Sequence, residues 1–350
     1  MRKTMFIILS LVAMTSPAMA EGLLGWLKPA VTGTGGKTIV LADSAELLTL
    51  EPGETEMYPK PSPDGRFLLV QSSKGRSTWI SRRYAENGDP AGRVTDDIRA
   101  NDSIHWKDTT HVYFLSGRAG GLGLWEKISD GEGMLRRLLE LHGILTQPLL
   151  LPDGALIAVR LTPAGSQTAN RNARSDGFDN WDFPGFRTSL VRIHADGGTH
   201  VLSEGVNPAL SPDGKWVVFS MPTGRSMHLF RMHPDGSELV QITSARSVDV
   251  QPSWSLDGKW VLFTSNRAHA DMRKTRKSNW DIWAINPDGR NLIQLTKDKA
   301  RDGAPHMGTD GQVYFHSDRP VSKQMREKRQ VKHVPRGFHI WAVALPDIRN

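Results

Sequence analysis

The sequence predicts an all-β protein, a six-bladed β-propeller of four-stranded antiparallel blades. Three observations lead to this prediction. An internal repeat returns after 44 residues, turn signals divide each repeat into short strands, and a lone strand-like segment near the N-terminus has no partner in its own repeat. A period of this size, built only from short strands and tight turns, is typical of propeller blades.

The repeat is clearest between residues 206 and 296. Segment 211–219 reads Ser-Pro-Asp-Gly-Lys-Trp-Val-Val-Phe, and segment 255–263 reads Ser-Leu-Asp-Gly-Lys-Trp-Val-Leu-Phe. The second halves, 228–236 and 281–289, both end in Pro-Asp-Gly. Gly in an Asp-Gly pair adopts the positive φ that a tight reversal requires, so each pair predicts a hairpin. Runs rich in Val, Ile, Phe and Trp flank these turns and predict strands, so each copy holds four, which we call a to d.

The other blades follow from this pair. Blade one begins near Pro59, blade two near His105, blade three near Pro148 and blade six near Pro305, with the clear pair as blades four and five. A seventh blade would need four strands in 162–188, which is too short. Blade six runs out of chain before a good fourth strand, whereas Glu46–Leu50 precedes blade one as a strand d should. We therefore expect this N-terminal strand to complete blade six and close the ring, leaving no open edge in that blade.

The first twenty residues predict a secretory signal peptide. Arg2 and Lys3 precede an apolar run, and Ala18-Met19-Ala20 matches a small-x-small cleavage site. The domain prediction is a signal peptide over 1–20, a flexible tail over 21–37 and the propeller over 38–350. The tail is expected to tuck against the propeller, the alternative being a docking peptide. The chain contains no Cys, so disulfides and Cys-ligated metals are excluded. Together these features favour a periplasmic location after cleavage of the signal.

The repeat motifs resemble those of the TolB family of propellers. The resemblance rests on Pro-x-x-Ser-Pro-Asp-Gly before an apolar strand, on Ser-Asn-Arg at 265–267 and Ser-Asp-Arg at 317–319, and on a second Asp-Gly before Leu-Thr. It covers essentially the whole predicted propeller. Full-length TolB proteins carry an α/β domain before the propeller, and the stretch between Ala20 and Thr38 has no room for one. The resemblance implies a protein-binding module of the cell envelope, with a peptidoglycan-associated lipoprotein or another envelope protein as partner.

Three long insertions fall between strands b and c, over 162–187, 267–278 and 318–338, and are expected on one face. Insertions gathered on one face of a repeat protein usually mark its binding face. The second and third carry net charges of +4 and +5, whereas the chain without its signal carries only +5. Such a local basic patch attracts acidic partners. The alternative is a solvated loop pair without a partner. The predicted binding residues in these two insertions are Arg267, Arg273, Lys274, Arg276, Lys277, Arg319, Lys323, Arg326, Lys328, Arg329, Lys332 and Arg336.

The first insertion mixes aromatic residues with Asn and Asp. Trp181 and Phe183 are predicted to contact a protein or a sugar. The alternative is that they fold back over the propeller. Asp176, Asp179 and Asp182 fit no calcium-loop spacing, so no metal site is predicted.

The sequence favours a binding role over catalysis. It has no Gly-x-Ser-x-Gly elbow, no His-Glu-x-x-His and no phosphate loop, and no cofactor is expected. We therefore predict a non-catalytic scaffold whose basic loops bind an acidic partner. An acidic glycan or an anionic membrane surface is a further candidate partner, and nucleic acid is not expected as a partner. The alternative is a propeller enzyme, of the polysaccharide lyase or hydrolase kind, acting on an acidic glycan at the channel mouth, where His105 and His306 occupy equivalent positions.

Overall fold

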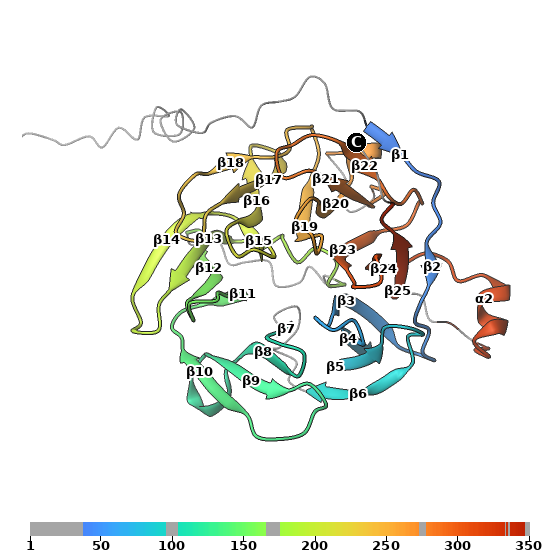
Figure 1. Ribbon diagram of the computed structural model, residues 1–350, viewed down its shortest axis with the longest axis horizontal. Helices are drawn as coiled ribbons and strands as arrows, with labels where there is room; N and C mark the ends of the chain where they lie inside the picture. Colours follow the sequence, from blue (N-terminus) through green and yellow to red (C-terminus); the bar gives the residue numbers. More distant parts are fainter. Residues whose placement is uncertain are drawn as a thin grey trace, which may run out of the picture.

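The computed structural model describes residues 38–95, 104–165, 176–272, 278–332, 334 and 337–346. In it, six β-sheets surround a central axis as the blades of a propeller (Figure 1). The predicted signal peptide and the 21–37 tail lie outside the described residues. No helix among the described residues is long and apolar enough to cross a membrane. The predicted six-bladed, all-β fold is confirmed.

The strands of each blade pair in chain order from the axis outward, except that two N-terminal strands form the outer edges of blades five and six. Blade one contains β3 (Thr55–Pro61), β4 (Phe67–Lys74), β5 (Ser77–Tyr84) and β6 (Pro90–Thr95); blade two contains β7 (His105–Trp106), β8 (His111–Ser116), β9 (Gly123–Ile128) and β10 (Arg136–Glu140). Blade three contains β11 (Leu145–Leu150), β12 (Leu156–Pro163), β13 (Phe186–Ile193) and β14 (Thr199–Glu204); blade four contains β15 (Val206–Leu210), β16 (Val217–Thr223), β17 (Ser226–Met232) and β18 (Val240–Gln241). Blade five contains β19 (Asp249–Trp254), β20 (Val261–Ser265), β21 (Asp281–Ile285) and β22 (Leu292–Gln294); blade six contains β23 (Asp302–Met307), β24 (Gln312–Ser317) and β25 (His339–Ala344). The described helices are the short η2 (Arg118–Gly120), η3 (Arg267–His269) and α2 (Lys323–Lys328).

The N-terminal strand closes the ring as predicted. Strand β2 (Glu46–Leu47) pairs antiparallel with β25, and the Leu48 N–H donates to the Ile340 carbonyl over 2.8 Å. A second N-terminal strand, β1 (Thr38–Val40), was not predicted. It adds to blade five as an outer parallel strand beside β22 (Figure 1). The first described segment therefore ties two neighbouring blades together.

The Ser-x-Asp-Gly motif forms the turns between strands a and b. In blade four, the Ser211 hydroxyl donates to the Asp213 carboxylate (2.5 Å) and accepts from the Trp216 N–H (2.9 Å). Gly214 adopts a φ of 70°, which a residue with a Cβ rarely does. Blade five repeats all of these contacts. The motif repeats in the sequence because the same side-chain-to-backbone bonds build the same turn.

Neighbouring blades bury their faces against each other. One cluster joins Val218 and Leu229 of blade four to Phe263 and Trp283 of blade five. A blade buries both faces only between two neighbours, so this burial drives ring formation rather than the folding of isolated blades.

The innermost strands share a backbone irregularity that shapes the axis. In five blades, the residue directly before the strand-a proline adopts a left-handed φ of 50° to 55°, and the strand register shifts there. These residues are Tyr58, Gln147, Asn207, Gln251 and Ala304. All five line the axial pocket, so the irregularity brings one side chain from each of these five blades to the axis.

Candidate functional site

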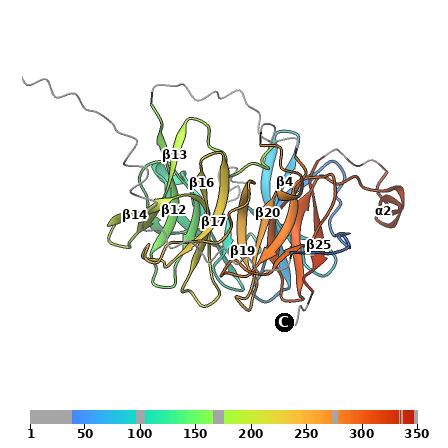
Figure 2. The same cartoon turned by 90° about the horizontal axis from the view of Figure 1, so that it is seen from above.

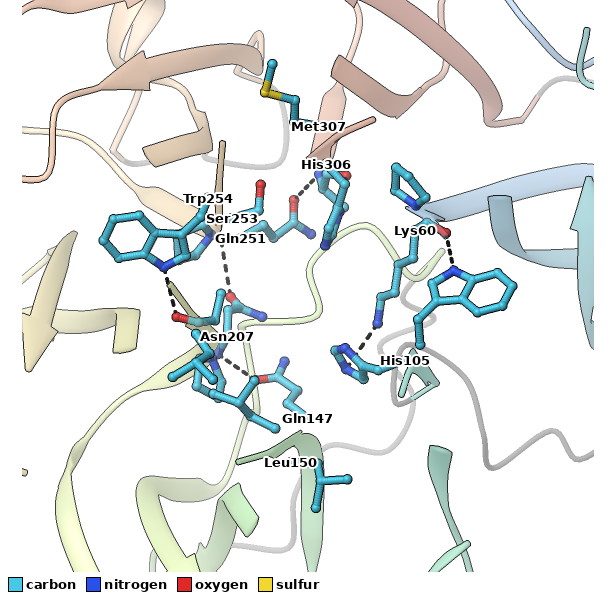
Figure 3. Close-up of a pocket in the computed structure, with 18 of the residues that line it drawn as sticks. Lys60, His105, Gln147, Leu150, Asn207, Gln251, Ser253, Trp254, His306 and Met307 are labelled. Atoms are coloured by element: carbon cyan, nitrogen blue, oxygen red, sulfur yellow. Dashed lines mark hydrogen bonds between the residues drawn. The ribbon is translucent and has the colours of Figure 1, made fainter. Parts of the chain in front are cut away.

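A pocket of about 710 Å³ lies along the propeller axis. Its lining begins at Gln147, Asn180 and Gln251 and extends to Pro152 and Leu256 in the turns between strands a and b. The pocket therefore opens on the rim of these turns. This volume lies within the range of roughly 300–1,000 Å³ that is usual for ligand sites. Figure 3 shows residues of different blades converging on it.

The far end of the pocket is closed by part of the blade-three insertion. Gln147 Nε2 donates to the Asn180 carbonyl (2.8 Å), and Gln251 Nε2 donates to Asn180 Oδ1 (3.0 Å) and to the Phe178 carbonyl (3.2 Å). Gln147 Oε1 accepts from the Asn207 N–H over 2.6 Å. Amide groups from blades three, four and five thus hold Asn180 across the axis. We call this crossing segment, residues 176–183, the plug.

Aromatic rings pack against the plug and hold it in place. Phe178 is 3% exposed and lies between the Trp280 ring (5.6 Å between centroids) and the stacked Phe338 ring (5.7 Å). Trp181 packs 5.1 Å from Trp280, and both Trp181 and Phe183 lie against the core of blades three and four. The structure therefore places these two predicted binding residues inward, as the alternative expected, because their apolar rings gain more from burial than from exposure. Both side chains are half-buried, and their contact with a partner stays a prediction.

One wall of the pocket is polar and basic, and blades six, one and two provide it. Lys60 is 8% exposed, and its Nζ donates to the Ile104 carbonyl (2.7 Å) and lies 3.2 Å from His105 Nε2. An ammonium group only donates, so His105 Nε2 accepts and its proton sits on Nδ1. Trp106 Nε1 donates to the Lys60 carbonyl over 2.8 Å and joins the two blades. Lys60 is therefore held in one place at the pocket wall (Figure 3).

The two histidines of this wall are uncharged at neutral pH. Burial, together with the nearby charge of Lys60, lowers the pKa of His306 to about 4. Burial and the charge of Lys60 also hold the pKa of His105 well below its usual range. The ring of Tyr113 stacks on His105 with centroids 5.3 Å apart. The basic wall thus presents the charge of Lys60 flanked by two neutral imidazoles.

The opposite wall is apolar or weakly polar. The strand position that holds Lys60, His105 and His306 in blades one, two and six holds Leu149, Ala209 and Ser253 in blades three, four and five. Leu210, Pro212 and Leu256 continue this wall to the mouth. The described lining contains two lysines and two histidines but no Asp or Glu. A pocket of this composition suits an anionic group with an apolar body.

Two of the predicted basic residues are buried inside blades. Arg267 donates to the Asp249 carboxylate over 2.6 Å, with side chains 9% and 0% exposed. Burial by itself raises the pKa of Asp249, but the adjacent Arg267 charge and the hydrogen bonds from neighbouring side chains together outweigh it and hold the pKa well below its usual range. In the next blade, Arg319 pairs with Asp302 (2.5 Å) and Asp43 (2.9 Å). The Ser-x-Arg motif thus binds strand b to the start of strand a, so neither arginine belongs to an exposed basic patch.

The other predicted basic residues that the structure describes belong to the blade-six insertion and lie on the outside of the ring. Helix α2 projects beyond the outer edge of blade six in both views (Figures 1 and 2). Lys323, Lys328 and Lys332 are exposed there, and Arg326 is half-buried. Arg329 donates to the Leu48 and Asn87 carbonyls. Arg273, Lys274, Arg276, Lys277 and Arg336 lie outside the described residues. The predicted basic residues of this insertion that the structure describes do not gather over the axis, so they lie apart from the pocket.

The sequence reasoning identified His105 and His306 as lining the channel but missed Lys60. Lys60 could have been found by its position in the repeat. Like His306, it stands two residues after the left-handed residue of strand a. The plug was foreseen only as an alternative, because no sequence pattern shows that an insertion crosses the axis. Among the described residues, no group of three His, Asp or Glu side chains is placed to hold a metal ion.

Comparisons with known proteins support the fold. No family model matches the chain. It is 24% identical over 189 residues to the uncharacterized peptidase YuxL of Bacillus subtilis (strain 168), a match that covers 46% of this chain and only 29% of that relative. The structure resembles a putative TolB from Agrobacterium tumefaciens (TM-score 0.50, 20% identity, 69% of this chain and 80% of that chain). It also resembles an oligogalacturonate lyase in complex with manganese (TM-score 0.50, 12% identity, 88% and 99%). The TolB-like propeller is therefore confirmed, and the same fold occurs in enzymes.

Proposed function

Because the chain folds as a TolB-like propeller with one basic axial pocket, we propose that it is a non-catalytic binding module of the periplasm. In this proposal the predicted signal peptide exports the chain, and the pocket mouth holds an acidic segment of an envelope protein. A peptidoglycan-associated lipoprotein is the partner that the TolB resemblance suggests. The observation that carries the proposal is the described pocket lining, which has Lys60 at its wall and no acidic residue.

The proposal moves the binding face from the basic insertions to the opposite rim. The insertions supply α2 on the outer edge, whereas the pocket opens among the turns between strands a and b. The apolar side chain of Leu256 at this mouth is 51% exposed. A rim with an apolar side chain beside a concave basic pocket has the anatomy of a protein-binding site.

Site-specific photocrosslinking tests this proposal. A benzophenone amino acid would replace Leu256 at the mouth, Lys323 on α2 or Val201 on the outer edge of blade three, and crosslinks would be formed in intact cells. We expect an envelope protein to crosslink from position 256, and Lys60→Gln to abolish that product. Crosslinks from position 323 alone would overturn the choice of face and favour the basic insertion.

An enzyme acting on an acidic glycan is the second candidate, and the neutral imidazoles favour it. His306 faces the pocket and is deprotonated at neutral pH, as a general base must be, and neutral His105 lies beside Lys60 on the same wall. Incubation with acidic oligosaccharides would reveal turnover by the release of shorter products. Turnover that disappears in the His105→Ala and His306→Ala variants would replace the binding-module proposal. Absence of turnover, with partner binding that survives both substitutions, supports the binding-module proposal.

A further inference from the structure

The mouth of the axial pocket carries exposed apolar side chains on blades three, four and five. Leu256 is 51% exposed, and Pro152 and Pro212 are exposed at the same turn position of the two preceding blades. Leu210 and Trp254 continue this apolar surface into the pocket. Covering apolar surface is favourable, so a segment with several large apolar side chains fits this mouth better than a polar one.

Strand β1 starts on the same rim as this mouth. It pairs parallel with β22, with Thr38 opposite Leu292, and β22 leaves the turn between strands c and d of blade five. That turn lies beside the turn between strands a and b of the same blade, because Asn286 Nδ2 donates to the Lys259 carbonyl over 2.8 Å. The chain before Thr38 therefore joins the propeller on the rim that holds the pocket mouth, and not on the side closed by the plug.

The distance from β1 to the mouth is short. The strands of blade five follow the order β1-β22-β21-β20-β19, so four inter-strand spacings separate β1 from the strand that ends at Trp254 in the pocket. At about 4.8 Å each, these spacings add up to roughly 19 Å. The ten residues from 28 to 37 span at most about 33 to 36 Å when extended. Residues before position 28 can therefore reach the mouth.

The sequence directly before these ten residues is apolar. Leu23, Leu24, Trp26 and Leu27 place four large apolar side chains within five residues. A Trp side chain brings a large, rigid contact area into a pocket at a small cost in conformational entropy. A segment tethered by a short linker also reaches a high effective concentration at a nearby site, so modest contacts are enough to hold it.

We infer that segment 23–27 docks in the mouth of the axial pocket of its own chain, with Trp26 against Leu210 and Leu256. This inference rests on the proposed binding function of the same pocket and adds its regulation. A partner that enters the mouth must first displace the segment. The segment therefore lowers the apparent affinity of every partner and excludes those that bind weakly.

Disulfide trapping in the purified protein tests the inference. The chain contains no Cys, so an introduced pair forms the only possible disulfide within it. The test pair is Lys28→Cys with Pro212→Cys at the mouth, where Leu256 at the same turn position of blade five shows that proline is not required. The matched control pair is Lys28→Cys with Ser237→Cys. Ser237 is exposed on the turn between strands c and d of blade four, on the same rim but away from the axis.

Electrophoresis without reductant follows disulfide closure after a mild oxidant is added. We expect the pair at 28 and 212 to close at least about tenfold faster than the pair at 28 and 237, because docking raises the effective concentration at the mouth alone. Adding Trp26→Ser/Leu27→Ser to both pairs is expected to make the two rates about equal. Leu256→Ser should slow closure at 212 and leave closure at 237 unchanged.

Two results would overturn the inference. One is closure at 237 that is as fast as closure at 212 in the chain with its natural segment 23–27. The other is disulfide-linked dimers in place of closed monomers, because the occupant would then be a second copy of the chain.

The photocrosslink from position 256 to an envelope protein tests the proposed function separately. Its yield is expected to rise several-fold in Trp26→Ser/Leu27→Ser, and an unchanged yield would refute competition at the mouth. A crosslink without fast closure at 212 would leave the proposed function in place and remove only the inference. Fast closure without any crosslink would keep segment 23–27 as the occupant and remove the proposed function.

Discussion

Removal of the Arg267 guanidinium is the sharpest test of how the blades are held together. Arg267 and Asp249 form an ion pair of 2.6 Å with both side chains nearly or fully buried. The guanidinium also lies 4.9 Å from the Phe263 ring centroid and 5.4 Å from that of Trp283. In Arg267→Met, Asp249 keeps its bonds from Ser247 and Ser265 but loses its counter-charge.

The expected loss is about 3 to 5 kcal/mol, the usual cost of leaving one partner of a buried ion pair. We expect the upper part of this range because each lost cation–π contact is worth about 0.5 to 1 kcal/mol or more when desolvated. For a chain of this size the loss corresponds to a fall in Tm of roughly 5 to 10 °C. Urea unfolding followed by tryptophan fluorescence, with thermal melts beside it, measures both quantities.

The double variant Asp249→Asn/Arg267→Met separates the stability contributed by the ion pair from that contributed by the packing of the Arg267 side chain. It removes both charges, so we expect it to recover at least half of the lost stability. The single variant should also be less destabilised at acidic pH, because burial without Arg267 raises the pKa of Asp249 and protonation then removes the buried charge. Lys323→Met, on the exposed helix α2, is the control and should change stability by no more than about 0.5 kcal/mol. A loss below about 1 kcal/mol in Arg267→Met, within that of an exposed pair, would refute the structural role and return Arg267 to the candidates for partner binding.

Three further predictions concern the plug, the ring closure and pH. Phe178→Ala should cost about 3 to 5 kcal/mol and loosen the closed end of the pocket, because Phe178 is buried among aromatic rings; urea unfolding measures the loss, and unchanged stability would contradict the packing described. Leu48→Pro should cost about 3 kcal/mol or more, since it removes the N–H that bonds Ile340 across the closing strand; protection from limited proteolysis equal to that of the wild type would contradict it. Burial and the neighbouring Asp302 raise the pKa of Asp281 to about 7, far above its unfolded value, so its stabilising effect is full at acidic pH and is lost as pH rises through 7. Tm should therefore fall between pH 5 and 8.5 and fall less in Asp281→Asn, and parallel profiles for the two proteins would exclude this origin.

The sequence predicted the fold well because its signals are local. The Ser-x-Asp-Gly turns carry their own hydrogen bonds, and the 44-residue period follows from one such turn to the next. The closure by Glu46–Leu47 was also readable, since blade six lacked a strand that the N-terminus could supply. Strand β1 escaped prediction because Thr38–Val40 resembles no strand of the repeat and pairs parallel at an outer edge.

The candidate site was predicted less well because it depends on distance in space. The charge of Arg267 and Arg319 was visible in the sequence, but their burial against Asp249 and Asp302 was not. The basic insertion of blade six was expected over one face, and α2 instead lies on the outer edge. Net charge counts residues and carries no information on where a loop folds or which carboxylate it meets.

By itself, the sequence determined the number of blades, the strand order within each blade and the N-terminal closure of the ring. These follow from short-range turn chemistry and from the need of every blade to bury both faces. Only the tertiary structure decided that the blade-three insertion crosses the axis, and that Lys60, His105 and His306 meet on one arc of the pocket wall. Those contacts join residues from different blades, and their geometry exists only once the ring has closed.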